Sequence, residues 1–110
     1  ITSDASGLAS AKAAYANQLQ YRGYKRALLS TLRHGALTGQ EAVFSRVGSQ
    51  KRDGMLLWGT RDTVVPYEVH ERVKELIPWL DFRPIDGGRH CVNYENADAV
   101  NPILIAFLAT

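Results

Sequence analysis

Residues 55–66 read Met-Leu-Leu-Trp-Gly-Thr-Arg-Asp-Thr-Val-Val-Pro. The first four residues are apolar, and a short apolar run of this kind predicts a strand buried on both faces of a parallel sheet. Gly59 ends the run, and a polar turn with one carboxylate, Asp62, comes after it. Pro66 suits the first position of a helix, where its missing N–H costs little. We therefore expect a strand, a turn and a helix in this order.

A second strand is expected after that helix. The helix places one apolar stripe on a single face, formed by Val69, Val73, Leu76 and Ile77. Residues 80–85 then read as a short strand, and Pro84 within it removes a backbone donor, which favours an edge position. The turn that follows leads to His90. Strand, helix and strand form one right-handed βαβ unit, so Asp62 and His90 both leave the carboxyl edge of the sheet and are expected to lie side by side.

Helical spacing also occurs outside this unit. It predicts helices within residues 1–20, 24–35, 38–48 and 98–108. Gly35 is expected to end the second of these helices. Thr38 and Glu41 have the spacing of a capping box for the third. Pro102 is expected at the first position or in the first turn of the last helix.

Two motifs resemble segments of the α/β-hydrolase fold. A strand that ends in Trp-Gly, with Asp62 three residues after Gly59 and Pro66 four after Asp62, resembles the segment that carries the family's triad acid. The turn before His90, with Glu95 five residues beyond it, resembles the family's histidine segment, although Arg89 stands where the family often has a small residue. Chain order in the family is nucleophile, acid, histidine. The resemblance therefore implies Asp62 as triad acid and His90 as triad base.

The family's nucleophile motif is missing from these 110 residues. The chain contains no Gly-x-Ser-x-Gly elbow, and none of its serines has that context; they are Ser3, Ser6, Ser10, Ser30, Ser45 and Ser49. The resemblance covers only the C-terminal portion of a family member. Such a piece carries two of three triad residues and is not expected to catalyse by itself.

Length, composition and charge indicate the general class of the protein. The length and the 45% hydrophobic, 22% charged composition are those of one globular domain large enough to bury a core. A net charge of +2 is too small to indicate nucleic acid or an acidic surface as a partner. The single cysteine excludes an internal disulfide and favours a reducing, cytoplasmic compartment. We find no membrane-spanning stretch or leader, and an initial Ile fits a truncated or processed chain better than a natural start.

Other side chains have competing interpretations. Cys91 beside His90 suggests a nucleophile pair, but a lone cysteine is more often a small hydrophobic residue. The three histidines have no metal-ligand spacing, so neither a metal nor another cofactor is expected. Glu95 either orients the histidine loop or caps the last helix. Tyrosines 15, 21 and 24 either line a substrate pocket or pack in the core.

These observations predict an α/β fold with a short parallel sheet, equivalent to the C-terminal βαβα portion of an α/β hydrolase. Residues 1–35 are expected to be cap-derived and connecting helices, and residues 36–110 to form the core portion. The implied function is hydrolysis of an ester-like or carbon–carbon bond in a small-molecule substrate, with the serine elsewhere. The alternative is a non-catalytic binding or self-association domain of the same fold. The bare edge of the first strand favours a homodimer.

Overall fold

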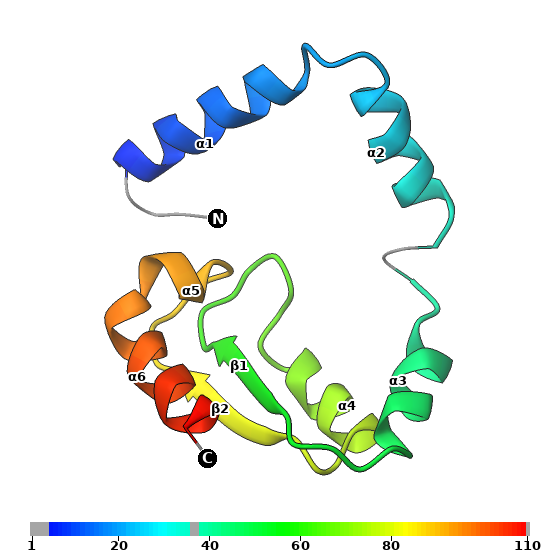
Figure 1. The fold of residues 1–110 in the computed structure, drawn as a ribbon, viewed down its shortest axis with the longest axis vertical. Helices are drawn as coiled ribbons and strands as arrows, with labels where there is room; N and C mark the ends of the chain where they lie inside the picture. The colour runs from blue at the N-terminus through cyan, green and yellow to red at the C-terminus, as the bar shows by residue number, and fades with distance from the viewer. Residues whose placement is uncertain (1–4, 36–37, 110) are drawn as a thin grey trace.

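The computed structural model of the protein describes residues 5–35 and 38–109. The elements run in the order α1 (Ala5–Gln18), α2 (Tyr24–Arg33), α3 (Glu41–Gly48), β1 (Met55–Gly59), α4 (Val69–Leu76), β2 (Asp81–Ile85), α5 (Val92–Glu95) and α6 (Ala97–Leu108). The two strands pair in parallel, with Met55 opposite Asp81 and Gly59 opposite Ile85. The protein is therefore a small α/β fold built on a two-stranded sheet, as the sequence predicts (Figure 1).

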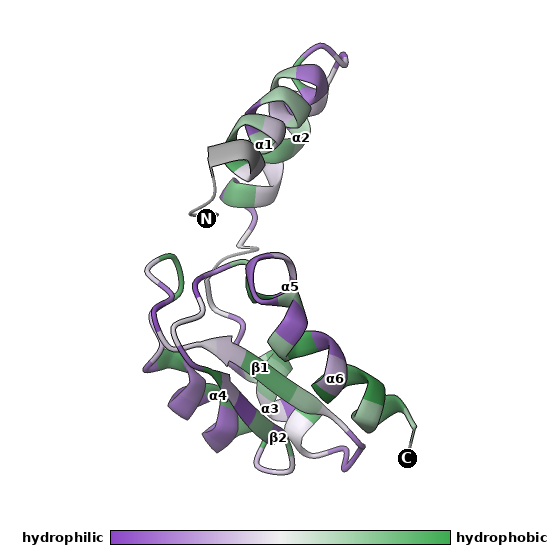
Figure 2. Ribbon diagram, turned by 90° about the vertical axis from the view of Figure 1, so that its left-hand side faces the viewer, coloured by the Kyte–Doolittle hydropathy of each residue, from purple (hydrophilic) through white to green (hydrophobic). Residues whose placement is uncertain are grey.

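Helices cover both faces of this sheet. Helix α4, which connects the strands, lies on one side, and α6 lies on the other (Figures 1 and 2). The buried apolar side chains of the described residues are Ile77 after α4, Ile85 at the end of β2 and Val100 in α6. This core is small because the described residues form only two strands to receive the apolar faces of the helices.

Helices α1 and α2 stand apart from the sheet (Figures 1 and 2). They meet through an edge-to-face contact of Tyr15 and Tyr24, whose ring centroids lie 6.2 Å apart. The apolar face of α2 remains open, with Leu28 40%, Leu29 49% and Leu32 49% exposed. The radius of gyration is 16.5 Å, against about 13 Å for a compact domain of this length. The chain is therefore more extended than a compact domain, and the apolar side chains of α2 are partly exposed to solvent.

Helix α3 packs against the end of α4. A Cβ built on Gly48 would overlap the carbonyl oxygen of Leu76, so only glycine allows this approach. The indole Nε1 of Trp79 donates a 2.9 Å hydrogen bond to the Gly48 carbonyl. Arg72 of α4 also pairs with Glu41 of α3 at 3.0 Å on the surface.

Several local predictions are wrong in detail. Helix α3 has Gln40 rather than Thr38 at its N-cap, without a side-chain capping bond, because the Gln40 amide instead donates to the carbonyls of Gly35 and Thr38. Helix α4 begins at Val69, since the amides of Val69 and His70 close tight turns onto residues 66 and 67. Pro102 lies in the second turn of α6, not the first. The positive φ of Gly35, 78°, does confirm a glycine stop after α2.

Strand β1 is less buried than predicted. Residues 55–58 are only half-buried, although the sequence predicts burial on both faces. The physical reason is that β1 pairs with β2 alone, which leaves its other edge open within the described part of the chain. None of the described helices combines the length and the hydropathy needed to cross a membrane.

Candidate functional site

The loop after β1 fixes the Asp62 carboxylate through its own backbone. Asp62 Oδ1 accepts hydrogen bonds from the amides of Val64 at 2.9 Å and Val65 at 3.0 Å. The Trp58 indole closes the same loop by donating to the Val65 carbonyl at 3.2 Å. One carboxylate oxygen is thus occupied by the turn, and the other, Oδ2, is left for a partner outside the loop.

The loop after β2 is bonded to the loop after β1. The amide of Thr60 donates to the Ile85 carbonyl at 3.0 Å, and the amide of Arg61 donates to the Gly88 carbonyl at 2.8 Å. The Thr60 hydroxyl oxygen accepts the Gly87 amide hydrogen at 2.8 Å. These bonds extend the pairing of the two strands beyond their ends, into the residues just before His90.

Glycines allow this close approach. A Cβ built on Gly59 would overlap the carbonyl oxygens of Gly88 and Arg89, and backbone atoms cannot rotate away. A Cβ on Gly88 would lie 2.8 Å from a Val92 methyl group and 3.0 Å from Ile85. Gly87 takes the positive φ of 67° that the turn requires. These glycines therefore allow the loop that carries His90 (residues 86–91, the histidine loop) to approach the loop that carries Asp62 (residues 60–68, the acid loop).

Asp62 and His90 are brought together, as their positions after neighbouring parallel strands predict. The Nδ1 atom of His90 lies 3.0 Å from Asp62 Oδ2. The carboxylate side chain is 7% exposed, whereas the imidazole is 38% exposed. A carboxylate only accepts hydrogen bonds, so this contact selects the tautomer with hydrogen on Nδ1 and makes Nε2 the acceptor.

The electrostatics of the pair favour a charged carboxylate. Burial acts to raise the pKa of Asp62, but the hydrogen bond from His90, the Val65 and Val64 amides and the charge of His90 together outweigh it. The pKa of the Asp62 carboxyl therefore lies below its usual value. An ionised carboxylate behind an imidazole stabilises the imidazolium form when the ring takes up a proton.

A cavity of about 220 Å³ adjoins the pair. Besides Asp62 and His90, it is lined by Leu57, Trp58, Gly59, Val65 and Val92. Apolar walls around a few polar groups are typical of small-molecule sites. The arrangement can hold an oriented imidazole beside an apolar group of a ligand.

The remaining candidates from the sequence are not part of this pair. Cys91 is a half-buried free thiol. His34 lies on the exposed end of α2, bonded to the Ser30 carbonyl at 2.7 Å, and His70 stacks on Phe82 with ring centroids 4.3 Å apart. Over the described ranges, no group of three or more His, Cys, Asp or Glu residues has the arrangement of a metal site.

Two serine side chains have hydrogen-bond partners close to them in sequence. Ser30 Oγ contacts His34 at 3.3 Å, and Ser49 Oγ donates to the Arg46 carbonyl at 2.8 Å. Ser3 lies outside the described residues. In the part of the chain that the structure describes, the side chain bonded to His90 is that of Asp62.

Sequence reasoning missed the contribution of Thr60. A single threonine in a turn carries no specific signal, because its partner, the Gly87 amide, lies 27 residues away in sequence. Helix α5 was also missed, since its four residues are too few to show helical periodicity.

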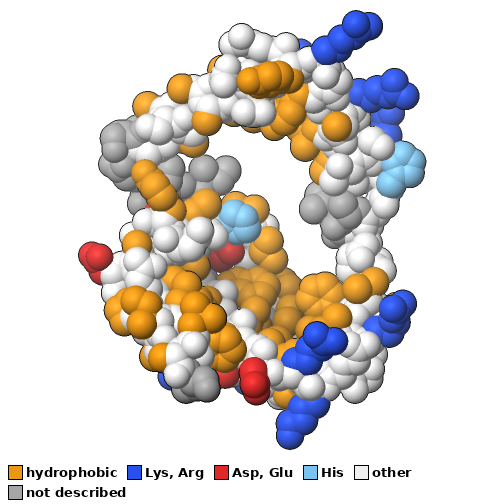
Figure 3. Space-filling model, viewed as in Figure 1, with side chains coloured by type: hydrophobic (Ala, Val, Ile, Leu, Met, Phe, Trp, Pro, Cys, Tyr) orange, Lys and Arg blue, Asp and Glu red, His pale blue; other side chains and the backbone are white. Residues whose placement is uncertain are grey.

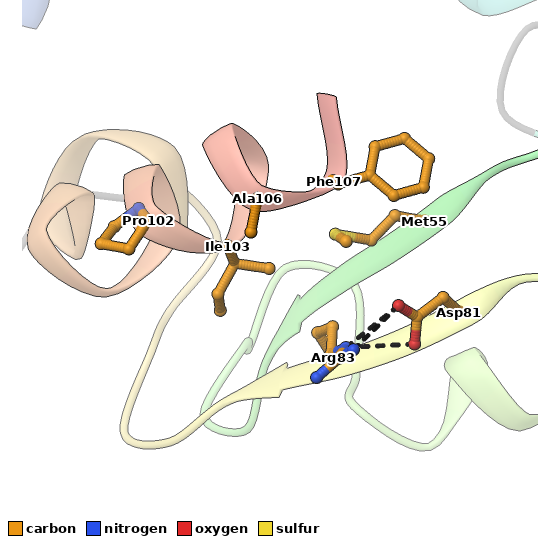
Figure 4. Close-up of a pocket in the computed structure, with 7 residues that line it drawn as sticks. All are labelled: Met55, Asp81, Arg83, Pro102, Ile103, Ala106 and Phe107. Atoms are coloured by element: carbon orange, nitrogen blue, oxygen red, sulfur yellow. Dashed lines mark hydrogen bonds and ion pairs between the residues drawn. The ribbon is translucent and has the colours of Figure 1, made fainter. Parts of the chain in front are cut away.

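A larger hollow of about 490 Å³ lies away from the Asp62–His90 pair (Figure 4). Met55 of β1 and Phe107 of α6 face each other across it, and Arg83 pairs with Asp81 at 3.0 Å on its β2 side. Its lining is largely apolar and includes no histidine.

Comparison with protein-family models finds no match to the chain, and comparison with curated proteins finds none either.

Proposed function

We propose that the chain is the acid- and histidine-bearing C-terminal portion of a serine-type α/β hydrolase. The observation that carries the proposal is the 3.0 Å contact between His90 Nδ1 and Asp62 Oδ2. The two residues come from loops after adjacent parallel strands, and open α/β sheets place their sites at this edge. The apolar cavity beside the pair supports a small-molecule substrate.

In this proposal each residue has a separate role. The Asp62 carboxylate holds the imidazole in the Nδ1–H tautomer and stabilises the imidazolium. His90 Nε2 takes the proton of a serine hydroxyl as that oxygen attacks the substrate, and then returns the proton to the leaving group. The product of the first step is a covalent acyl-enzyme, which water hydrolyses by the same route.

We place the nucleophilic serine outside these 110 residues. The described serines lie on or beside α1, α2 and α3, and the two with side-chain bonds to named partners, Ser30 and Ser49, are bonded within their own segments. The isolated chain is then inactive. The reaction class is hydrolysis of an ester-like or carbon–carbon bond.

A fluorophosphonate probe with intact-mass readout tests this proposal, because it labels only activated serines. We expect no label on this chain and one label on the full product of its gene. In the full product, His90→Ala should abolish labelling, because the serine loses its base. His34→Ala, which removes an exposed histidine of α2, is the matched control and should leave labelling unchanged.

Two results would overturn the assignment. Stoichiometric labelling of the 110-residue chain would place the nucleophile within it. Absence of labelling in both proteins would exclude a serine hydrolase and leave the binding domain as the explanation.

A second candidate, self-association, is favoured by the open edge of β1. Within the described residues the strand pairs on one side only, and residues 55–58 are half-buried and apolar. A largely apolar hollow, lined by Met55 and Phe107 among others, lies between the face of the sheet and α6 (Figure 4). Hydrophobic side chains are also widespread on the face shown in Figure 3. A bare apolar edge strand pairs readily with a second copy, so we propose a homodimer of the isolated chain through β1.

A further inference from the structure

Thr60 is the one residue of the acid loop whose side chain bonds the histidine loop's backbone, within the part of the chain that the structure describes. Its hydroxyl oxygen accepts the Gly87 amide hydrogen at 2.8 Å. Its hydroxyl hydrogen points toward Asp86 Oδ1, at an oxygen–oxygen distance of 3.5 Å. The two residues are 27 positions apart in sequence. Thr60 precedes Asp62 by two residues, and Gly87 precedes His90 by three.

We propose that Thr60 is a positioning residue, whose side-chain hydroxyl sets the histidine loop in the register that brings His90 onto Asp62. The purpose of this role, to orient a catalytic base, rests on the proposed function. The positioning itself is a property of the chain and can be measured without catalysis.

The backbone bonds between the two loops do not replace the hydroxyl. The Thr60 amide donates to the Ile85 carbonyl on one side of the turn, and the Arg61 amide donates to the Gly88 carbonyl on the other side. Between them lies Gly87, which takes a positive φ of 67° inside a turn that the Gly88 amide closes onto the Ile85 carbonyl at 3.0 Å. The Thr60 hydroxyl is the side-chain group that binds the Gly87 amide itself. A shift of this amide moves His90 relative to the carboxylate.

The protein is expected to tolerate loss of the hydroxyl. Gly87 is exposed, so water can take up its N–H when the threonine oxygen is removed. Loss of the hydroxyl should therefore loosen the loop without unfolding the domain. A neutral hydrogen bond is worth enough to change an equilibrium about fivefold, and we expect the ratio of paired to unpaired His90 to fall by this factor.

The test is ¹⁵N NMR of the His90 imidazole in the 110-residue chain, above the pH at which the ring is protonated. The ring-nitrogen shifts give the fraction of the Nδ1–H tautomer. Thr60→Val keeps the shape and removes the hydroxyl, and should lower the Nδ1–H to Nε2–H ratio about fivefold. Thr60→Ser keeps the hydroxyl and should restore the wild-type ratio. Thr60→Ala removes the same group in a smaller side chain, in case the valine variant does not fold.

Two further variants separate positioning from general effects. Thr63→Val makes the same chemical change at an exposed site of the acid loop and should leave the tautomer ratio unchanged. Asp62→Asn removes the charged partner itself and should abolish the preference for Nδ1–H. An unchanged ratio in folded Thr60→Val or Thr60→Ala would overturn the role of Thr60 and leave the proposed function intact. An unchanged ratio in Asp62→Asn would show that the pair does not form in solution, and the proposed function would then fail as well.

Discussion

At the scale of single residues, Asp62 divides its two carboxylate oxygens between its own turn and His90. Oδ1 accepts the amides of Val64 and Val65, which is the role of an ordinary turn aspartate. Oδ2 faces His90. The two interpretations of this residue, turn former and triad acid, are therefore compatible, and the turn bonds keep the carboxylate from rotating away from the ring.

This double role predicts a pH-dependent contribution to stability. Because the folded state lowers the pKa of Asp62, the unfolded chain binds this proton first as pH falls. The stabilisation is complete above the ordinary carboxyl pKa of about 4. It decreases below that value and is lost once pH falls through the folded pKa. Urea unfolding from neutral to acidic pH should show a larger decrease in the wild type than in Asp62→Asn. A smaller decrease remains in the variant, because Arg72 also lowers the pKa of Glu41.

Asp53→Asn is the control, since Asp53 is an exposed carboxylate in the loop before β1. Its unfolding profile should follow that of the wild type. If Asp62→Asn and the wild type have the same profile, the native state does not favour the ionised form of the Asp62 carboxyl, and the prediction is contradicted.

At the scale of elements, the ends of the two strands decide where the site forms. Gly59 and Ile85 are opposite each other at the ends of β1 and β2. Beyond them the loops remain in backbone contact, through the bonds from Thr60 and Arg61. The site is thus a continuation of the strand pairing, and any group that separates the loops should separate the acid from the histidine.

Gly59→Ala tests this dependence. The added methyl group would overlap the backbone carbonyls of Gly88 and Arg89, so the loops must move apart. We expect a loss of about 3 kcal/mol in the free energy of unfolding and loss of the Nδ1–H preference of His90, measured by urea titration and ¹⁵N NMR.

Gly23→Ala is the matched glycine control. Gly23 has a positive φ of 88°, and an added methyl group there would meet nothing within 4 Å, so the cost is backbone strain of about 1–2 kcal/mol. The His90 tautomer should not change. Equal tautomer shifts in both variants would mean that His90 responds to general destabilisation rather than to separation of the loops.

At the scale of the whole molecule, the accessible surface is 8371 Å², against about 6100 Å² for a compact protein of this mass. Only Ile77, Ile85 and Val100 are buried among the hydrophobic residues that the structure describes. Leu28, Leu29 and Leu32 of α2 remain 40–49% exposed, and within the described residues β1 pairs along one edge only. We propose that a second copy of the chain covers the edge of β1.

Sedimentation velocity at micromolar concentration distinguishes these states. We expect the isolated chain to sediment as a dimer. Met55→Lys places a charge in the apolar hollow beside Phe107, at the start of β1. It should weaken dimerisation about tenfold or more, because a second copy that covers this surface would bury an unpaired charge. Val43→Lys, a charge on the exposed face of α3, is the control and should still dimerise. A wild-type chain that is monomeric at this concentration would overturn the homodimer.

The sequence by itself determined the order of the main elements and the positions of Asp62 and His90 on adjacent loops. It could do so because apolar periodicity, glycine and proline act locally, and because parallel strands must end at one edge of the sheet. Local patterns failed where other contacts competed: Gln40 replaced Thr38 as the N-cap, and α4 began three residues after Pro66. Only the tertiary structure decided the 3.0 Å contact of His90 with Asp62, the Thr60–Gly87 bond and the half-buried state of β1. The two contacts depend on which residues distant in sequence meet. The burial of β1 depends on how many strands lie beside it. A local sequence pattern encodes neither of these.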